Sequence, residues 1–234
     1  MSVHGKANVM INVGVIGLGM MGLTHLDVYS KLEGVEVFAI ADKDRDRLHG
    51  KAQAAGNIEG QAQGGFDFEA VQKYEDAEKL IHHKKIDVVD ICLPTHLHLI
   101  FARKVLRAGK HVLIEKPLAR TAADAKKLVR SAQSAKGLAM PAMCMRFWPG
   151  WTWLKKAVSE GTYGKVLSAT FRRVAEHPGG PFYERGELCG GAVLDVHIHD
   201  TDFVQFLFGV PEAVSSVGYS KLTGEVDHLV TQYH

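Results

Sequence analysis

The sequence predicts an α/β protein in which a doubly wound parallel sheet is followed by a smaller α+β part. Short runs of β-branched and other apolar residues alternate with helical segments as far as residue 145. A cluster of glycines directly follows the first of these runs. Beyond residue 145 the alternation gives way to helices and a pair of long strands. We therefore predict two domains, 1–145 and 146–234, the second of them incomplete, with an open and mainly antiparallel sheet.

The first part is expected to contain five strands, each an apolar run of the kind buried inside a parallel sheet. These strands are 11–16, 35–41, 86–93, 111–114 and 138–145. Segments with apolar residues at helical spacing, or with polar and alanine-rich sequence, lie between them. We predict helices at 20–32, 44–55, 74–83, 97–108 and 121–136. Residues 56–65 hold four glycines and predict a loop.

The second part has a different pattern. We predict helices at 151–159 and 195–208, and an alternating strand at 165–174. Two further strands, 213–219 and 226–233, flank Thr223-Gly224 and are expected to pair antiparallel.

The composition is that of a globular protein, with 46% hydrophobic and 23% charged residues. A net charge of +2 gives no electrostatic footprint for nucleic acid or a membrane surface. No apolar stretch is long enough to span a bilayer. The three cysteines, Cys92, Cys144 and Cys189, are far apart and form no C-x-x-C pair. We expect neither disulfides nor a structural metal site, and a reducing cytoplasmic location.

The glycine cluster, Gly17-Leu18-Gly19-Met20-Met21-Gly22, is a G-x-G-x-x-G motif between a strand and a helix. In that context Gly17 allows a tight turn, and Gly19 lets a pyrophosphate approach the backbone. Gly22 allows the helix to pack closely on the strand. The free N–H groups at the start of the helix, including those of Met20 and Met21, then hold the phosphates. The motif predicts a Rossmann dinucleotide-binding domain.

An acidic residue stands where the motif requires one, at the end of the second strand. A carboxylate at Asp42 accepts hydrogen bonds from the adenosine ribose and repels a 2′-phosphate. This favours NAD as the cofactor. Lys43, Arg45 and Arg47 follow closely and leave NADP open, because they can bind a phosphate if they turn inward.

Two further segments follow strands and are expected at the carboxyl edge of the sheet, where ligands of such folds bind. One of these segments is Glu115-Lys116-Pro117, in which the X-Pro bond can be cis. By its spacing alone, this segment is also consistent with a turn that holds an ordinary ion pair. The other segment is Pro94-Thr95-His96, in which Thr95 is expected to be a helix N-cap.

The densest polar sequence runs from Gly190 to Asp202. On one helix, Asp195 and His199 share a face, and an Asp beside a His suits a general base. A satisfied structural histidine is the alternative. A metal site is a rival because further ligand types are present, but helical geometry keeps them from converging. Arg146, beside a cluster of aromatic residues, is expected to face a substrate cleft.

The ordered set of segments resembles the glucose–fructose oxidoreductase/inositol dehydrogenase (Gfo/Idh/MocA) family. The matching segments are VGVIGLGMMG, AD with an arginine three residues on, DVVDICLPTHLHLIFARKVLRAGKHVLIEKPLA and GGAVLDVHIHDTDFVQFLFG. The EKP segment with its upstream helix is the most specific of them. The resemblance implies a Rossmann domain followed by an α/β domain with a large open sheet. It also implies NAD(P)-dependent oxidation or reduction of a sugar or cyclitol.

Residue roles follow from the resemblance. Lys116 matches the family lysine that contacts the reacting hydroxyl, and Asp195 and His199 match its D-x-x-x-H pair. His197 stands where the family often has a small residue, which predicts an altered substrate pocket. The expected cofactor-binding residues are Gly17, Gly19, Met20, Met21, Gly22, Asp42, Pro94, Thr95, His96, Glu115 and Lys116.

The sequence therefore predicts an NAD(P)-dependent dehydrogenase acting on CH–OH groups, with His199 as base, Asp195 orienting it and Lys116 stabilising the oxygen. No catalytic metal is expected. A non-catalytic NAD-binding protein and an NAD-dependent glycoside hydrolase of the same fold remain alternatives. Family members run well beyond 234 residues, so we expect a chain truncated at its C-terminus. An open sheet face also predicts a homo-oligomer.

Overall fold

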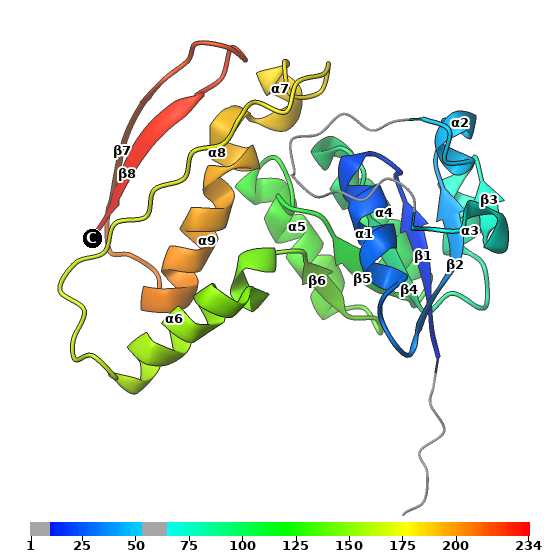
Figure 1. Cartoon of the computed structure of the whole chain (residues 1–234), viewed down its shortest axis with the longest axis horizontal. Helices are drawn as coiled ribbons and strands as arrows, with labels where there is room; N and C mark the ends of the chain where they lie inside the picture. Colours follow the sequence, from blue (N-terminus) through cyan, green and yellow to red (C-terminus); the bar gives the residue numbers. More distant parts are fainter. Residues whose placement is uncertain (1–9, 53–64) are drawn as a thin grey trace, which may run out of the picture. The chain divides into compact units, whose positions relative to one another are not determined.

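The computed structural model describes residues 10–52 and 65–234 (Figure 1). The chain divides into two compact units, Met1–Met140 and Pro141–His234, each with a core of its own. The division falls N-terminal to the boundary predicted at residue 145. Within the described ranges, no helix has the length and apolar content needed to cross a membrane.

Unit 1 is built on a six-stranded sheet in the order β3-β2-β1-β4-β5-β6. The strands are β1 (Ile11–Ile16), β2 (Val35–Ala41), β3 (Gln72–Tyr74), β4 (Val88–Ile91), β5 (His111–Ile114) and β6 (Ala139–Pro141). The pairs β1–β2, β1–β4, β2–β3 and β4–β5 are all parallel. Strand order reverses direction between β1 and β4, which is the point where open α/β sheets bind ligands at their carboxyl edge.

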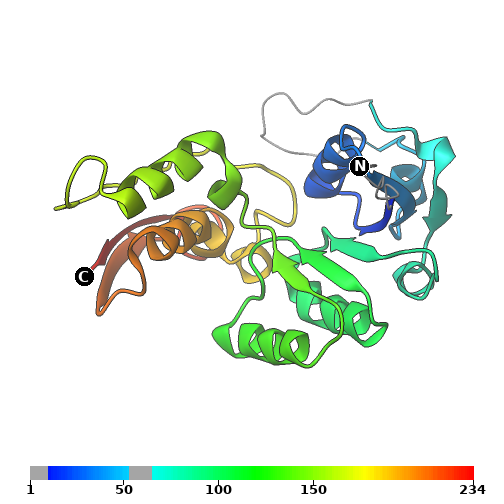
Figure 2. The same cartoon turned by 90° about the horizontal axis from the view of Figure 1, so that it is seen from below.

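Helices cover both faces of this sheet. They are α1 (Met20–Tyr29), α2 (Arg45–Leu48), α3 (Ala77–Ile81), α4 (Thr95–Arg107) and α5 (Ala122–Gln133), with a 3-10 turn at Phe68–Ala70. Leu26 of α1 and Leu48 of α2 pack in one core cluster, while α3, α4 and α5 supply the other. Figure 2 shows blue α1 and green α5 on opposite sides of the sheet. The sheet is thus buried on both faces, as its apolar runs predict.

Unit 2 consists of helices and one hairpin. Its elements are a 3-10 turn (Cys144–Phe147), α6 (Pro149–Glu160), α7 (Gly186–Cys189), α8 (Gly191–Asp195), α9 (His197–Phe208), β7 (Val214–Tyr219) and β8 (His228–Tyr233). The core lies between α6 and α9, where Phe203 is fully buried against Trp151. β7 and β8 pair antiparallel. The predicted fold class is confirmed by this pair and the six-stranded sheet.

Several element predictions need correction. No strand forms at 165–174, and the predicted helix at 74–83 shrinks to α3 because Gln72–Tyr74 joins the sheet edge as β3. The strand predicted at 138–145 is only β6, followed by a 3-10 turn. α9 begins at His197 instead of Asp195. The predicted helix 44–55 is α2 where described, and its end and the loop predicted at 56–65 lie almost wholly outside the described residues.

Candidate functional site

The glycine loop of unit 1 joins β1 to α1. Gly17 has φ 93°, and a Cβ on it would lie 2.6 Å from the carbonyl oxygen of Cys92. A Cβ on Gly22 would lie 1.9 Å from the carbonyl oxygen of Gly17. Larger residues at either position would therefore push the loop, α1 and the end of β4 apart. Glycine at these two positions therefore allows the loop, α1 and the end of β4 to pack closely.

Gly19 is different, because a Cβ built there would meet no atom within 4 Å. Its φ of −75° is open to any residue. Gly19 is the N-cap of α1, and no side chain among the described residues caps this helix. The backbone N–H groups of the first turn lie at the positive end of the helix, next to the open space at Gly19. This cradle fits a pyrophosphate, as the motif predicts.

Asp42 follows β2 and lies beside the glycine loop. Its Oδ2 accepts a hydrogen bond from the N–H of Leu18 (2.7 Å), and its Oδ1 accepts one from Asp44 (2.9 Å). An ionised carboxylate has about four acceptor positions, so capacity for ribose hydroxyls remains. Nη1 of Arg47 lies 3.9 Å from Oδ2. The loop and the acid thus come together as the sequence predicts.

The other predicted cofactor segments lie after β4 and β5. Thr95 is buried and begins α4, but Pro94 and not Thr95 is the N-cap, so the predicted capping by Thr95 is wrong. Pro94 has an extended backbone, whereas Thr95 is already helical. His96 is exposed. The Lys116–Pro117 bond is cis.

A histidine that sequence reasoning did not select joins these two segments. His98 is buried, and its Nε2 lies 2.7 Å from the carbonyl oxygen of Leu93. Its Nδ1 lies 2.9 Å from the carbonyl oxygen of Pro117. The sequence signal that could have identified His98 is the His96-Leu97-His98 spacing at the start of α4, since it puts His98 on the helix face opposite His96.

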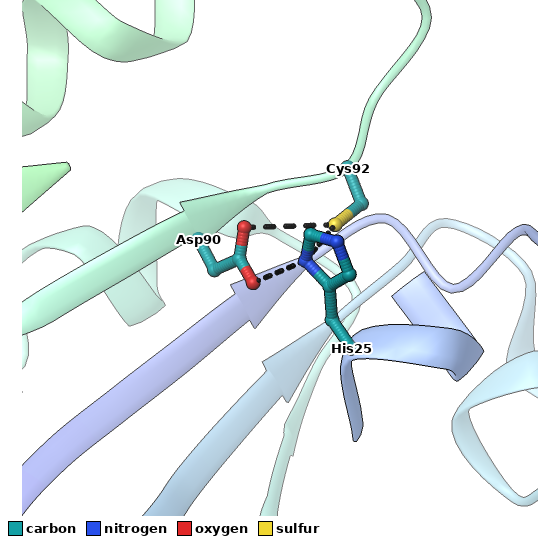
Figure 3. A group of neighbouring side chains, drawn as sticks. All are labelled: His25, Asp90 and Cys92. Carbon is teal, nitrogen blue, oxygen red and sulfur yellow. Dashed lines mark hydrogen bonds and ion pairs between the residues drawn. The ribbon is translucent and has the colours of Figure 1, made fainter. Parts of the chain in front are cut away.

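A second histidine, His25, is partly buried and lies beside Asp90 and Cys92 (Figure 3). His25 of α1 contacts Asp90 of β4 (Nδ1–Oδ2, 2.7 Å) and Glu115 (Nε2–Oε1, 3.2 Å). Cys92 and Tyr29 also contact Asp90. Burial disfavours the charged imidazole, but the contacts with Asp90, Cys92 and Glu115 outweigh it and raise the pKa of His25. Burial and the Asp90 carboxylate raise the pKa of the Cys92 thiol to about 12.

In unit 2 the predicted catalytic pair lies at a helix break. Asp195 ends α8, Val196 interrupts the helix, and His199 lies in the first turn of α9. Gly191 opens α8 with φ 60°, and a Cβ there would lie 2.7 Å from the carbonyl oxygen of Val226. The Gly-Gly sequence therefore lets this segment approach the strand that leads into β8.

The remaining polar residues between Gly190 and Asp202 each contact a different partner. Asp200 pairs with Arg173 through two hydrogen bonds of 2.9 Å. Asp202 pairs with Arg146 at 2.6 and 2.8 Å. His197 lies 3.1 Å from the hydroxyl of Tyr233. These acids and the histidine do not gather around one point, which weighs against the metal alternative.

His197 faces the hairpin of unit 2. It lines an open cavity of about 600 Å³ between α9 and the β7–β8 sheet. Burial lowers the pKa of His197. Arg146 lies against the ring of Phe206 as well as Asp202. Roles for Arg146 and His197 in substrate binding stay predictions.

Fold and glycine loop together define a dinucleotide-binding oxidoreductase module. Residues 11–143 match the family model of the oxidoreductase family with an NAD-binding Rossmann fold, and residues 151–232 match the GFO/IDH/MocA C-terminal domain. The chain belongs to this Gfo/Idh/MocA oxidoreductase family.

Named relatives agree with this assignment. The chain is 31% identical over 202 residues to a myo-inositol 2-dehydrogenase of Thermotoga maritima, covering 85% of this chain and 55% of the relative. It is 32% identical over 215 residues to a levoglucosan dehydrogenase of Pseudarthrobacter phenanthrenivorans, covering 88% and 53%. The chain thus spans about half the length of these curated relatives.

Solved structures share the fold. A levoglucosan dehydrogenase in complex with NADH and levoglucosan matches with a TM-score of 0.79 and 25% identity, over 96% of this chain and 63% of that chain. A probable dehydrogenase from Thermotoga maritima matches with a TM-score of 0.75 and 27% identity, over 94% and 64%.

Proposed function

We propose that this chain forms the cofactor-binding and catalytic part of an NAD-dependent dehydrogenase that acts on a sugar or cyclitol. The observation that carries the proposal is the open space at Gly19, beside Asp42 and the first turn of α1, which no side chain among the described residues caps. The dehydrogenases of inositol and levoglucosan among its relatives support the substrate class. NAD, when bound, supplies the hydride acceptor at its nicotinamide ring.

The residues of the chain supply binding and proton transfer. The first turn of α1 holds the pyrophosphate, and Asp42 accepts hydrogen bonds from the ribose. His199 takes the proton of the reacting hydroxyl, and Asp195 orients its ring. The ammonium group of Lys116 hydrogen-bonds the same oxygen and stabilises its developing negative charge. The proton leaves on His199 as the carbinol hydrogen leaves as hydride.

Cofactor binding is tested by a pair of glycine substitutions. Gly19→Ala fills the open cradle without meeting protein atoms, so the fold should persist while the affinity for NADH falls by about tenfold or more. Gly150→Ala is the matched control, because Gly150 also lies at a helix start with no atom within 4 Å of its built Cβ. Calorimetric titration with NADH measures both. Equal affinity in the two variants would contradict the cradle.

Catalysis is tested by NADH formation from NAD with myo-inositol and levoglucosan as substrates. Lys116→Ala and His199→Ala should each lower kcat by roughly 10²–10⁴-fold. Lys84→Ala and His82→Ala, at exposed positions, are the matched controls and should retain activity. Normal turnover in the two site variants would remove these roles. Tight NADH binding without any turnover would favour the non-catalytic alternative, and glycoside cleavage without net NADH would favour the hydrolase.

A further inference from the structure

The His25 cluster lies behind the glycine loop and is not used by the proposed reaction. Its charged members are almost completely buried, since the side chains of Asp90 and Glu115 are 0% and 9% exposed. The cluster is formed from three places: His25 and Tyr29 lie on α1, Asp90 lies on β4 with Cys92 just after it, and Glu115 directly follows β5. Burying two carboxylates is unfavourable unless a cation or several donors lie beside them.

The hydrogen-bond partners of the Asp90 carboxylate indicate that Nδ1 of His25 carries a proton. Oδ2 of Asp90 lies 2.9 Å from the hydroxyl of Tyr29 and 2.7 Å from Nδ1, while the thiol of Cys92 lies 3.6 Å from Oδ1. An ionised carboxylate is acceptor-only, so all three neighbours donate to it. Figure 3 shows the imidazole ring and the thiol of Cys92 turned toward this carboxylate.

The second ring nitrogen faces the other carboxylate. Nε2 lies 3.2 Å from Oε1 of Glu115, and the opposite oxygen, Oε2, accepts the backbone N–H of Lys116 at 2.9 Å. A bare nitrogen lone pair facing an ionised carboxylate would be repulsive. A second proton on Nε2 removes the repulsion and gives each carboxylate a charged donor.

A metal ion fits this cluster less well than a proton does. His25, Asp90 and Cys92 offer ligand atoms within 4.8 Å of one another. Nitrogen and oxygen ligands of a tetrahedral zinc ion lie about 3.3 Å apart, given zinc–ligand distances near 2.0 Å. The 2.7 Å separation of Nδ1 and Oδ2 is that of a charge-assisted hydrogen bond.

We infer that His25 is a doubly protonated imidazolium that bridges Asp90 and Glu115 and acts as a positioning residue for the Glu115-Lys116-Pro117 segment. The imidazolium links α1, whose first turn forms the pyrophosphate cradle, to the residue that fixes the backbone of Lys116. The positioning role rests on the proposed function, whereas the charge state of His25 does not. Loss of the cation would leave two buried carboxylates and release the segment that carries Lys116.

The charge state is tested on the 234-residue chain by NMR of the histidine ring nitrogens between pH 6 and 9, with the signals of His25 identified by their loss in His25→Gln. Both ring nitrogens of His25 should keep the ¹⁵N shifts of protonated nitrogens throughout. A lone-pair shift at either nitrogen of His25 at neutral pH, or displacement of its protons by added Zn²⁺, would overturn the inference.

The positioning role is tested by steady-state kinetics of His25→Gln. A glutamine keeps hydrogen-bonding groups but carries no charge, so kcat should fall by about 10- to 100-fold, the effect of a misplaced catalytic group. The KM for NAD should change much less. The titratable groups that face His25 are Asp90, Glu115, Cys92 and Tyr29.

Tyr29→Phe is the matched control, because it removes one hydrogen bond to Asp90 and no charge. It should leave kcat nearly unchanged. Unchanged kcat in a folded His25→Gln, or equal losses of kcat in both variants, would overturn the positioning role. If the wild type oxidises no polyol, the proposed function fails together with the positioning role. The NMR measurement then still decides the charge state on its own.

Discussion

β1 in unit 1 and β7 in unit 2 have the same length and opposite surroundings. β1 lies between β2 and β4, and its last four residues are buried. Within the described part of the chain β7 pairs only with β8, and all six residues of β7 are exposed. The buried sheet of unit 1 therefore fixes the glycine loop at its edge. In unit 2 the packed core lies between α6 and α9, away from the outer face of the hairpin.

The largest effects are expected from truncating each core. Leu26 lies between α1 and the sheet, and Phe203 lies between α9 and Trp151. Leu26→Ala should lower the free energy of unfolding of unit 1 by about 2–5 kcal/mol, and Phe203→Ala should lower that of unit 2 by about 3–5 kcal/mol. Chemical denaturation measures both.

The chain offers separate probes for this measurement. All three tryptophans, Trp148, Trp151 and Trp153, lie in unit 2, so their fluorescence reports on that unit alone. Far-UV circular dichroism reports on both. Phe203→Ala should shift the fluorescence transition, and Leu26→Ala should shift the dichroism more than the fluorescence. Identical shifts of both signals in both variants would mean that the units unfold as one.

The next effect concerns how unit 2 holds its irregular segment. Arg173 binds the buried Asp200 through two hydrogen bonds. Arg173→Ala leaves that carboxylate without its cation and should lower the fluorescence-monitored free energy of unfolding of unit 2 by about 2–3 kcal/mol. Arg172→Ala, at the exposed neighbouring position, should change it by less than about 0.5 kcal/mol. Similar losses in the two variants would argue against the pair.

The Arg173 segment also shows why some of the fold escapes sequence analysis. In the structure Phe171 contacts Trp151 and Arg173 pairs with Asp200, although the strand predicted for this segment does not form. A strand also needs a hydrogen-bonding neighbour, and the segment 165–174 has none among the described residues. By contrast, β1, β2 and β5 have the predicted bounds, because buried parallel strands leave long apolar runs.

The same distinction holds for the candidate site. The glycine loop and Asp42 could be located from spacing, because their geometry is set within one strand–helix–strand unit. His25 could not, because Asp90 is 65 residues away in sequence and meets it only when β4 is placed beside β1. The relation of Asp195 to His199 was assumed to be that of one helix, whereas Val196 breaks it.

A smaller effect should appear as a pH dependence of unit 1. Because folding raises the pKa of His25, its contribution to stability is complete below the unfolded value of about 6.5 and is lost as pH rises above it. The free energy of unfolding should fall by at most about 1.4 kcal/mol per pH unit from this group. Denaturation followed by dichroism from pH 6.5 to 8.5 measures the slope. His25→Gln should flatten it, and an unchanged slope in that variant would assign the dependence to other groups.

The smallest effect is expected in β7, when the same substitution is placed in β1 and in β7. Val15 of β1 is 0% exposed, whereas Val217 of β7 is 74% exposed. Val15→Thr buries a hydroxyl in the core of unit 1 and should cost about 1–3 kcal/mol. Val217→Thr places the same hydroxyl in water and should change stability by less than about 0.5 kcal/mol. A loss at Val217 as large as that at Val15 would mean that the exposed face of β7 is covered in solution, and sedimentation of the two variants would show whether a second copy covers it.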